Sequence, residues 1–93
     1  MKTIIIQIGN SDDKLTQIQW HDFVKEVDNW INIWVEEIHF FGCPAAHSPW
    51  QNAAWIAEIK ETSIRLLLEQ LIVVRKHYRQ NSIAVTVGET SFV

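Results

Sequence analysis

Hydrophobic and polar positions follow two periods along this chain, and each change of period marks an expected boundary between strand and helix. Residues 2–8 are rich in isoleucine, with Ile4, Ile6 and Ile8 on one side of an extended chain. This pattern predicts a strand inside a sheet. Residues 9–14 are turn formers and end the strand.

A helix is expected next. Thr16 and Gln19 have the spacing of a capping box, so we expect the helix to begin there and to run to about Ile33. Its apolar residues recur every three or four positions, which places them on one stripe. The stripe comprises Phe23, Val24, Val27, Trp30, Ile31 and Trp34.

Two more strands are predicted, one from Trp34 or Val35 to Gly42 and one from Trp50 to Ile59. Alternation in the first places Ile38 and Phe40 on one face, and Glu37, His39 and Phe41 on the other. In the second, the face expected in the core carries Ala53, Trp55, Ala57 and Ile59.

The last third of the chain predicts a helix from Glu61 to about Tyr78 and a strand from Ile83 to Val87. The resulting order, β-α-β-β-α-β, is that of the ferredoxin-like α+β fold. We therefore predict a single domain over residues 1–93. Its four-stranded antiparallel sheet would have the strand order 4-1-3-2, with both helices on one face.

This topology brings three connections to the same end of the sheet, namely residues 10–14, 43–50 and 79–82. It also leaves one sheet face without helices. That face would carry Ile5, Gln7, His39, Phe41, Trp50, Asn52, Ala54, Ile56, Ala84 and Thr86. Because this surface is apolar, we expect a second copy or a ligand to cover it.

Composition favours self-association, since 47% hydrophobic residues and five tryptophans are high for 93 residues. The net charge of −3 leaves no basic field for duplex nucleic acid. The single cysteine, Cys43, excludes an internal disulfide and fits a reducing compartment. The apolar run near the N-terminus is too short for a signal peptide or a membrane span. We expect a cytoplasmic homodimer or larger homo-oligomer with no membrane partner.

His39, Cys43 and His47 are metal-ligand types spaced four residues apart. A strand that runs into a proline-containing loop does not project such residues together, and structural zinc usually takes four ligands. We therefore predict no metal and no cofactor.

His39 is also expected beside Gln7, Asn52 and Thr86 on the uncovered face. There it is the candidate general base if the protein is an enzyme. The alternative is that these polar groups bind one another across a dimer interface, because the sequence indicates no carboxylate that would orient the imidazole.

The turn after the first strand ends at a helix N-terminus, where Asn10 and Lys14 are candidate contacts for an anion. Asp12 and Asp13 would repel phosphate, so the alternative role is turn and cap, with one of them paired to Arg79.

Trp50, followed by Gln51 and Asn52, carries the strongest indication of a ligand. An indole stacks on a planar ring while neighbouring amides bind the edge of that ring. Basic and polar side chains of the turn at 79–82 would then hold a phosphate or carboxylate. The candidate ligand-binding residues are Asn10, Lys14, His47, Trp50, Gln51, Asn52, Arg79, Gln80 and Ser82. Alternatively, Trp50 packs at a dimer contact.

Three segments resemble small, mostly uncharacterised proteins of phages and bacteria, namely residues 8–17 (IGNSDDKLTQ), 49–55 (PWQNAAW) and 78–90 (YRQNSIAVTVGET). The resemblance implies a phage or accessory-gene setting. Small oligomeric phage proteins include binders that sequester nucleotide immune signals, so it also implies a counter-defence type of role. It assigns no catalytic residues.

We therefore predict a homo-oligomeric, non-enzymatic module that binds a small anionic, nucleotide-derived ligand in the cytoplasm of a bacterial host. One alternative is a small dimeric ferredoxin-like enzyme that uses His39 on the sheet face. The other is a protein-interaction module that uses the tryptophan-rich surface.

Overall fold

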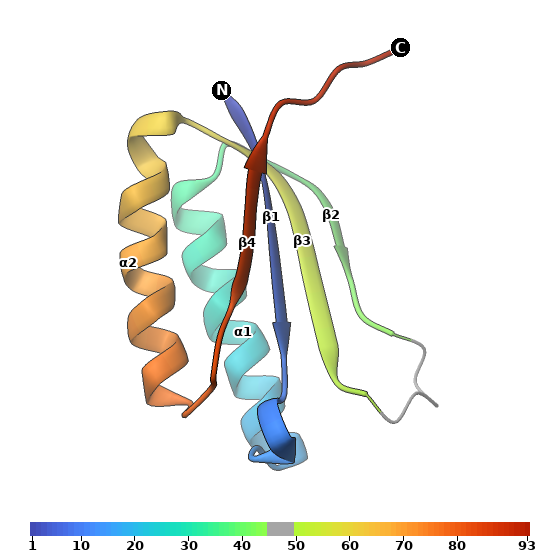
Figure 1. Ribbon diagram of the computed structural model, residues 1–93, viewed down its shortest axis with the longest axis vertical. Helices are drawn as coiled ribbons and strands as arrows, with labels where there is room; N and C mark the ends of the chain where they lie inside the picture. The colour runs from blue at the N-terminus through green and yellow to red at the C-terminus, as the bar shows by residue number, and fades with distance from the viewer. Residues whose placement is uncertain (45–49) are drawn as a thin grey trace.

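The computed structural model describes residues 1–44 and 50–93 and has the predicted order of strands and helices (Figure 1). The elements are β1 (Lys2–Gly9), the short 3-10 turn η1 (Ser11–Asp13), α1 (Gln17–Trp34), β2 (Glu37–Gly42), β3 (Asn52–Ile59), α2 (Glu61–His77) and β4 (Ala84–Gly88).

The four strands form one antiparallel sheet in the order β2-β3-β1-β4. This is the predicted order 4-1-3-2 counted from the other edge, so the predicted ferredoxin-like fold is confirmed. Both helices cover one face of the sheet, and both termini leave from the same end (Figure 1). The turn η1 and the start of α1 lie at the opposite end.

The core lies between the helices and one face of β1 and β3. From Ile4 to Ile8 in β1 and from Ala53 to Ile59 in β3, every second residue is buried, as the alternation predicted. Trp55 is fully buried, and its Nε1 donates a hydrogen bond to Asp28 Oδ1 of α1 at 2.9 Å. The expected core role of Trp55 is therefore confirmed, with the indole N–H satisfied.

The capping box at the start of α1 is also confirmed. Gln19 N donates to Thr16 Oγ1 at 3.2 Å, and Thr16 N donates to Gln19 Oε1 at 2.9 Å. The ends of β1 and β4 differ from expectation by one residue, and the starts of β2 and β3 differ by more. β2 begins at Glu37 because α1 continues through Trp34, and β3 begins at Asn52 rather than at Trp50.

The predicted faces of β2 are wrong for Phe40 and Phe41, whereas His39 lies beside Glu58 on the uncovered face, as predicted. The pairing of β2 with β3 shifts between Ile38 and Phe40, which is the mark of a bulge, and an extra residue reverses the alternation that follows. Phe40 therefore lies opposite Ile56 on the uncovered face. Phe41 lies opposite Trp55 on the core side, with ring centroids 5.0 Å apart.

Tyr78 joins the end of α2 to the middle of α1. Its hydroxyl donates to Glu26 Oε2 at 2.9 Å, and its ring lies 5.1 Å from the ring of Phe23. Burial, followed by the hydrogen bond to the Glu26 carboxylate, raises the pKa of Tyr78 to about 12.

This raised pKa makes stability depend on alkaline pH. The protonated tyrosine stabilises the fold fully below about pH 10, and the contribution is lost as the pH rises from about 10 towards 12. We expect Tyr78→Phe to lower the free energy of unfolding by about 1 kcal/mol at pH 8, through loss of the bond to Glu26. Above pH 10 the gap between wild type and variant should shrink or reverse. Urea unfolding of both proteins from pH 8 to pH 11.5 measures this gap, and a gap that stays constant would contradict the assignment.

Candidate functional site

Asn10 ties the turn after β1 to the entry of β3. Its backbone N–H donates to Gln51 O at 3.2 Å. Its side-chain Nδ2 donates to Gln51 Oε1 at 2.6 Å and to Leu15 O at 2.9 Å, and its Oδ1 accepts from Leu15 N at 3.0 Å. Gln51 in turn donates from Nε2 to Gln17 Oε1 at the start of α1. Both predicted ligand contacts, Asn10 and Gln51, are therefore engaged in holding the two segments together.

The end of α2 is fixed by a Schellman motif. Gln80 N donates to Arg75 O at 3.0 Å, and Arg79 N donates to Lys76 O at 3.1 Å. Arg79 takes the left-handed conformation that the motif requires, with φ of 56°. The motif turns the chain so that the side chain of Gln80 points into the protein, where Gln80 is only 3% exposed.

The buried amide of Gln80 bridges the turn after β1 and the end of α2. Its Oε1 accepts from Ser11 N at 2.7 Å, and its Nε2 donates to Tyr78 O at 3.0 Å. Lys14 adds a second link, because its Nζ donates to Arg79 O and Asn81 Oδ1, both at 3.0 Å. The predicted convergence of the loops is thus confirmed for their described residues. Gln80 and Lys14 serve as links between them.

Backbone strain is concentrated at this same end. Among the described residues, the non-glycine residues with positive φ are Asp12, Asp13 and Arg79, at 54°, 50° and 56°. Left-handed backbone costs an L-residue about 1–2 kcal/mol, although Asp tolerates it better than most. Strained backbone of this kind is found mainly at functional sites, and it persists only where the surrounding structure holds it in place.

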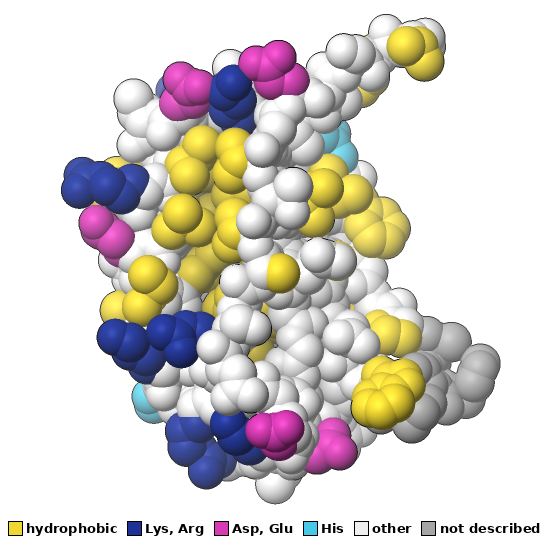
Figure 2. All heavy atoms as spheres, in the orientation of Figure 1, with side chains coloured by type: hydrophobic (Ala, Val, Ile, Leu, Met, Phe, Trp, Pro, Cys, Tyr) yellow, Lys and Arg dark blue, Asp and Glu magenta, His cyan; other side chains and the backbone are white. Residues whose placement is uncertain are grey.

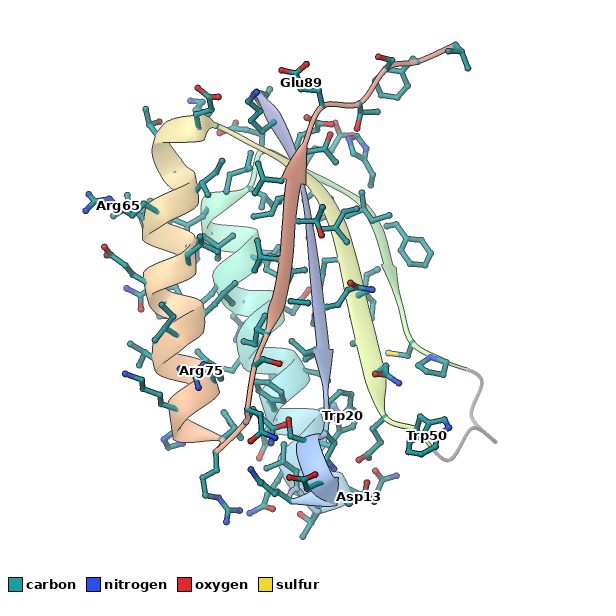
Figure 3. All side chains as sticks on the ribbon, in the orientation of Figure 1. Asp13, Trp20, Trp50, Arg65, Arg75 and Glu89 are labelled. Atoms are coloured by element: carbon teal, nitrogen blue, oxygen red, sulfur yellow. The ribbon has the colours of Figure 1, made fainter. Side chains whose placement is uncertain are left out.

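A cavity of about 520 Å³ opens between the turn and the start of β3. It is lined by Gln7, Ile8, Gly9, Asn10, Ser11, Asp12, Asp13, Trp50, Gln51, Asn52, Ser82 and Ala84. Trp50 is 72% exposed and forms part of this lining. Figure 3 shows Trp50 and Asp13 at this end of the molecule, far from Glu89 at the other end.

The cavity unites some of the predicted binding residues and leaves out others. Those it brings together are Asn10, Trp50, Gln51, Asn52 and Ser82. Lys14, Arg79 and Gln80 are at the same end but do not line it. His47 lies outside the described residues.

The charge of the lining differs from the predicted anion site. None of the described residues that line the cavity is Lys or Arg, whereas Asp12 and Asp13 both contribute to it. In Figure 2 acidic side chains appear at this lower end, and basic side chains lie more towards α2. The suggested ion pair of an aspartate with Arg79 is not formed within residues 1–44 and 50–93. The sequence and the predicted topology placed the aspartates in a turn at the same end as Trp50, but gave them a role as turn and cap rather than a place in the lining.

His39 lies apart from the polar partners predicted for it. Its Nε2 is 3.4 Å from Glu58 Oε1, and Glu58 Oε1 also accepts from Thr3 Oγ1 at 3.1 Å. Gln7 and Asn52 instead line the cavity beside Trp50. The predicted cluster is therefore not formed. The sequence argument missed Glu58 as the carboxylate beside His39. Glu58 is an even number of residues from Asn52 on β3, so the alternation of the strand already placed both on the uncovered face.

A second hollow, of about 460 Å³, surrounds His39 at the end of the sheet that carries the termini. It is lined by Met1, Glu37, His39, Glu58, Glu89, Thr90 and Phe92.

In the part of the chain that the structure describes, no group of three or more His, Cys, Asp or Glu is arranged to hold a metal ion. Neither of the described helices combines the length and the hydropathy needed to cross a bilayer.

Comparisons with known proteins define the fold of this chain. A dimeric ferredoxin-like protein of unknown function from Thermobifida fusca superimposes with a TM-score of 0.65. The match covers 97% of this chain and 92% of the other, at 10% sequence identity. No family model and no curated protein matches the sequence. The chain thus has a ferredoxin-like fold, while the resemblance to phage and bacterial proteins stays a prediction.

Proposed function

We propose that this protein is a self-associating, small-molecule-binding protein that holds a planar ligand in the cavity beside Trp50. The observation that carries the proposal is an indole 72% exposed in the wall of a cavity of about 520 Å³. A ring stacked on an indole gains dispersion and quadrupole contacts that water does not provide.

The frame of this cavity supports the proposal because it is held by internal bonds. Asn10, Gln51 and Gln80 use their side chains to join the turn, the entry of β3 and the end of α2. Asn52 and Ser82 make no side-chain hydrogen bond to another described residue, which leaves them for a ligand. A site with a fixed frame and unused polar groups binds a ligand with little loss of conformational freedom.

Self-association is supported by the sheet face without helices. Phe40 is 53% exposed there, beside the partly buried Ile5, Ala54 and Ile56. The Thermobifida fusca protein with this fold is described as dimeric. A second copy on this face would cover Phe40 and remove the apolar surface from water.

The two parts of the proposal meet in shared residues. Gln7, Asn52 and Ala84 belong to the uncovered face by their register and also line the cavity. A partner sheet placed on that face would therefore form a roof over the ligand. The nucleotide-derived ligand predicted from the sequence is the first class to test, as free base, nucleoside and nucleotide.

An enzyme that uses His39 is the second candidate function. The specific observation in its favour is the pair of His39 Nε2 and Glu58 Oε1 at 3.4 Å inside the second hollow. A carboxylate that orients an imidazole is the arrangement a general base requires.

The ligand proposal predicts that Trp50→Ala weakens binding. Stacking on an aromatic side chain is worth about 1–3 kcal/mol per base, so affinity should fall roughly 5- to 100-fold. Thermal shift and tryptophan fluorescence with bases, nucleosides and nucleotides measure the affinity, while urea unfolding should show stability unchanged within about 0.5 kcal/mol. Ile33→Ala, at an exposed apolar position near the other end of α1, is the control and should bind as wild type does. Equal affinity of Trp50→Ala and wild type would remove the indole from the site.

The interface proposal predicts that a charge at Phe40 separates the copies. Phe40→Lys leaves the core intact, because the ring is already half exposed, but places an ammonium in the proposed interface. We expect the dissociation constant of the dimer to rise at least tenfold, an order of magnitude typical of a central interface residue. Analytical ultracentrifugation should show the mass fall from twice 10.9 kDa towards 10.9 kDa. Val73→Lys, on an exposed apolar position of α2, is the control, and a monomeric wild type would refute the proposal.

The enzyme candidate predicts turnover that depends on His39. Wild type, His39→Gln and Glu58→Gln would be incubated with the same ligand panel, and products would be separated by chromatography. If His39 is the base, His39→Gln should reduce product formation at least 100-fold, while Glu58→Gln should have a smaller effect. Binding beside Trp50 should persist in both variants. Absence of product with every ligand that binds would rule the candidate out for this panel.

A further inference from the structure

We infer that the cavity beside Trp50 takes a planar cation, such as an amidinium, a guanidinium or a protonated heterocycle. This inference rests on the proposed function, because it assigns the chemical class of the ligand for the same cavity. It replaces the anionic ligand expected from the sequence with one of opposite charge.

The first step concerns the charges that face the ligand. Asp12 and Asp13 line the cavity, and the described lining contains no Lys or Arg to offset them. The nearest basic side chain along the turn is Lys14, and its Nζ is held at 3.0 Å by Arg79 O and Asn81 Oδ1. Two carboxylates without a cationic neighbour in the lining repel phosphate and attract a positive ligand.

The second step concerns the aromatic wall. An indole is the best side-chain partner for a cation placed over its face, because its π-system presents negative charge there. A planar cation combines this attraction with stacking, so one ligand satisfies both Trp50 and the carboxylates. An anion over the same ring would meet the negative face and the aspartates together.

The third step concerns hydrogen bonds. Asn10 has used both Nδ2 hydrogens on Gln51 Oε1 and Leu15 O, so this lining amide has no donor left for an anion. The side chains of Asp12 and Asp13 make no hydrogen bond or ion pair with another described residue, and as carboxylates they only accept. Asn52 and Ser82 can donate as well as accept, whereas the two carboxylates only accept, so the lining as a whole suits a ligand with several N–H donors.

Three probes that share the same ring but differ in charge test the inference. Benzamidine is a planar cation, benzamide is neutral and benzoate is an anion, and all three are small enough for a cavity of about 520 Å³. Binding would be followed by the indole N–H signals in nitrogen-15 NMR spectra, with the Trp50 signal assigned through its loss in Trp50→Phe. We expect the Trp50 signal to shift with affinity in the order benzamidine, benzamide, benzoate. Neighbouring members should differ roughly 3- to 10-fold at low salt.

Charge removal identifies the source of this preference. Asp12→Asn combined with Asp13→Asn keeps residues that tolerate left-handed backbone and removes both charges. We expect the preference of this variant for benzamidine over benzamide to fall to about twofold, the part that the cation over the indole of Trp50 supplies. Glu36→Gln combined with Glu69→Gln removes the same charge from exposed ion pairs elsewhere, and its preference for benzamidine should equal that of wild type.

The outcomes separate the inference from the proposed function. If benzoate binds as tightly as benzamidine, the inference of a cationic ligand is wrong, although the cavity remains the site. The same conclusion follows if binding is lost in Arg79→Gly but kept in the aspartate variant. A preference unchanged in the aspartate variant would also overturn it. If no probe shifts the Trp50 signal, the inference fails. The proposed function is then decided separately by the base, nucleoside and nucleotide panel.

Discussion

The buried amide of Gln80 is the interaction on which the loop-rich end depends. It accepts from Ser11 N and donates to Tyr78 O, so a single side chain fixes the distance between the turn after β1 and the end of α2. A buried amide deprived of either partner carries a penalty of about 1–3 kcal/mol, which makes the link a strong constraint. The strained backbone at Asp12 and Asp13 persists because it is attached to this constraint on one side and to Asn10 on the other.

The same end therefore combines rigidity with local strain, whereas the described strands and helices elsewhere are regular apart from the bulge in β2. The strands and helices satisfy their backbone groups in the usual ladders, and Trp55 satisfies its indole on Asp28. The cavity lies beside the turn after β1, where the backbone of Asp12 and Asp13 is left-handed. This distribution fits the general rule that local departures from the best sequence for a fold collect at functional positions.

How much could be predicted from the sequence depended on whether the signal was local. The capping box of Thr16 and Gln19 and the alternation that buries Trp55 are short-range patterns, and both were correct. The bulge in β2 leaves no such pattern, because apolar residues on both sides of His39 fit either face. The role of Gln80 depends on its contact with Ser11, which is 69 residues away in the sequence. From the sequence, the polar side chain of Gln80 suggested a ligand contact, whereas in the fold it links two segments.

The lining of the cavity shows a further limit of the same kind. The sequence identified Trp50, Asn52 and the aspartates separately, and topology brought them to one end, but the sign of the local charge depended on where Lys14 points. In the proposed dimer, a partner sheet over Gln7 and Asn52 would exclude water from the cavity and lower its effective dielectric. The attraction between the aspartates and a cationic ligand would then exceed that of a similar pair on an open surface. The proposed self-association and the proposed ligand charge would thus follow from one arrangement, in which residues of the open sheet face and of the strained turn line the same cavity.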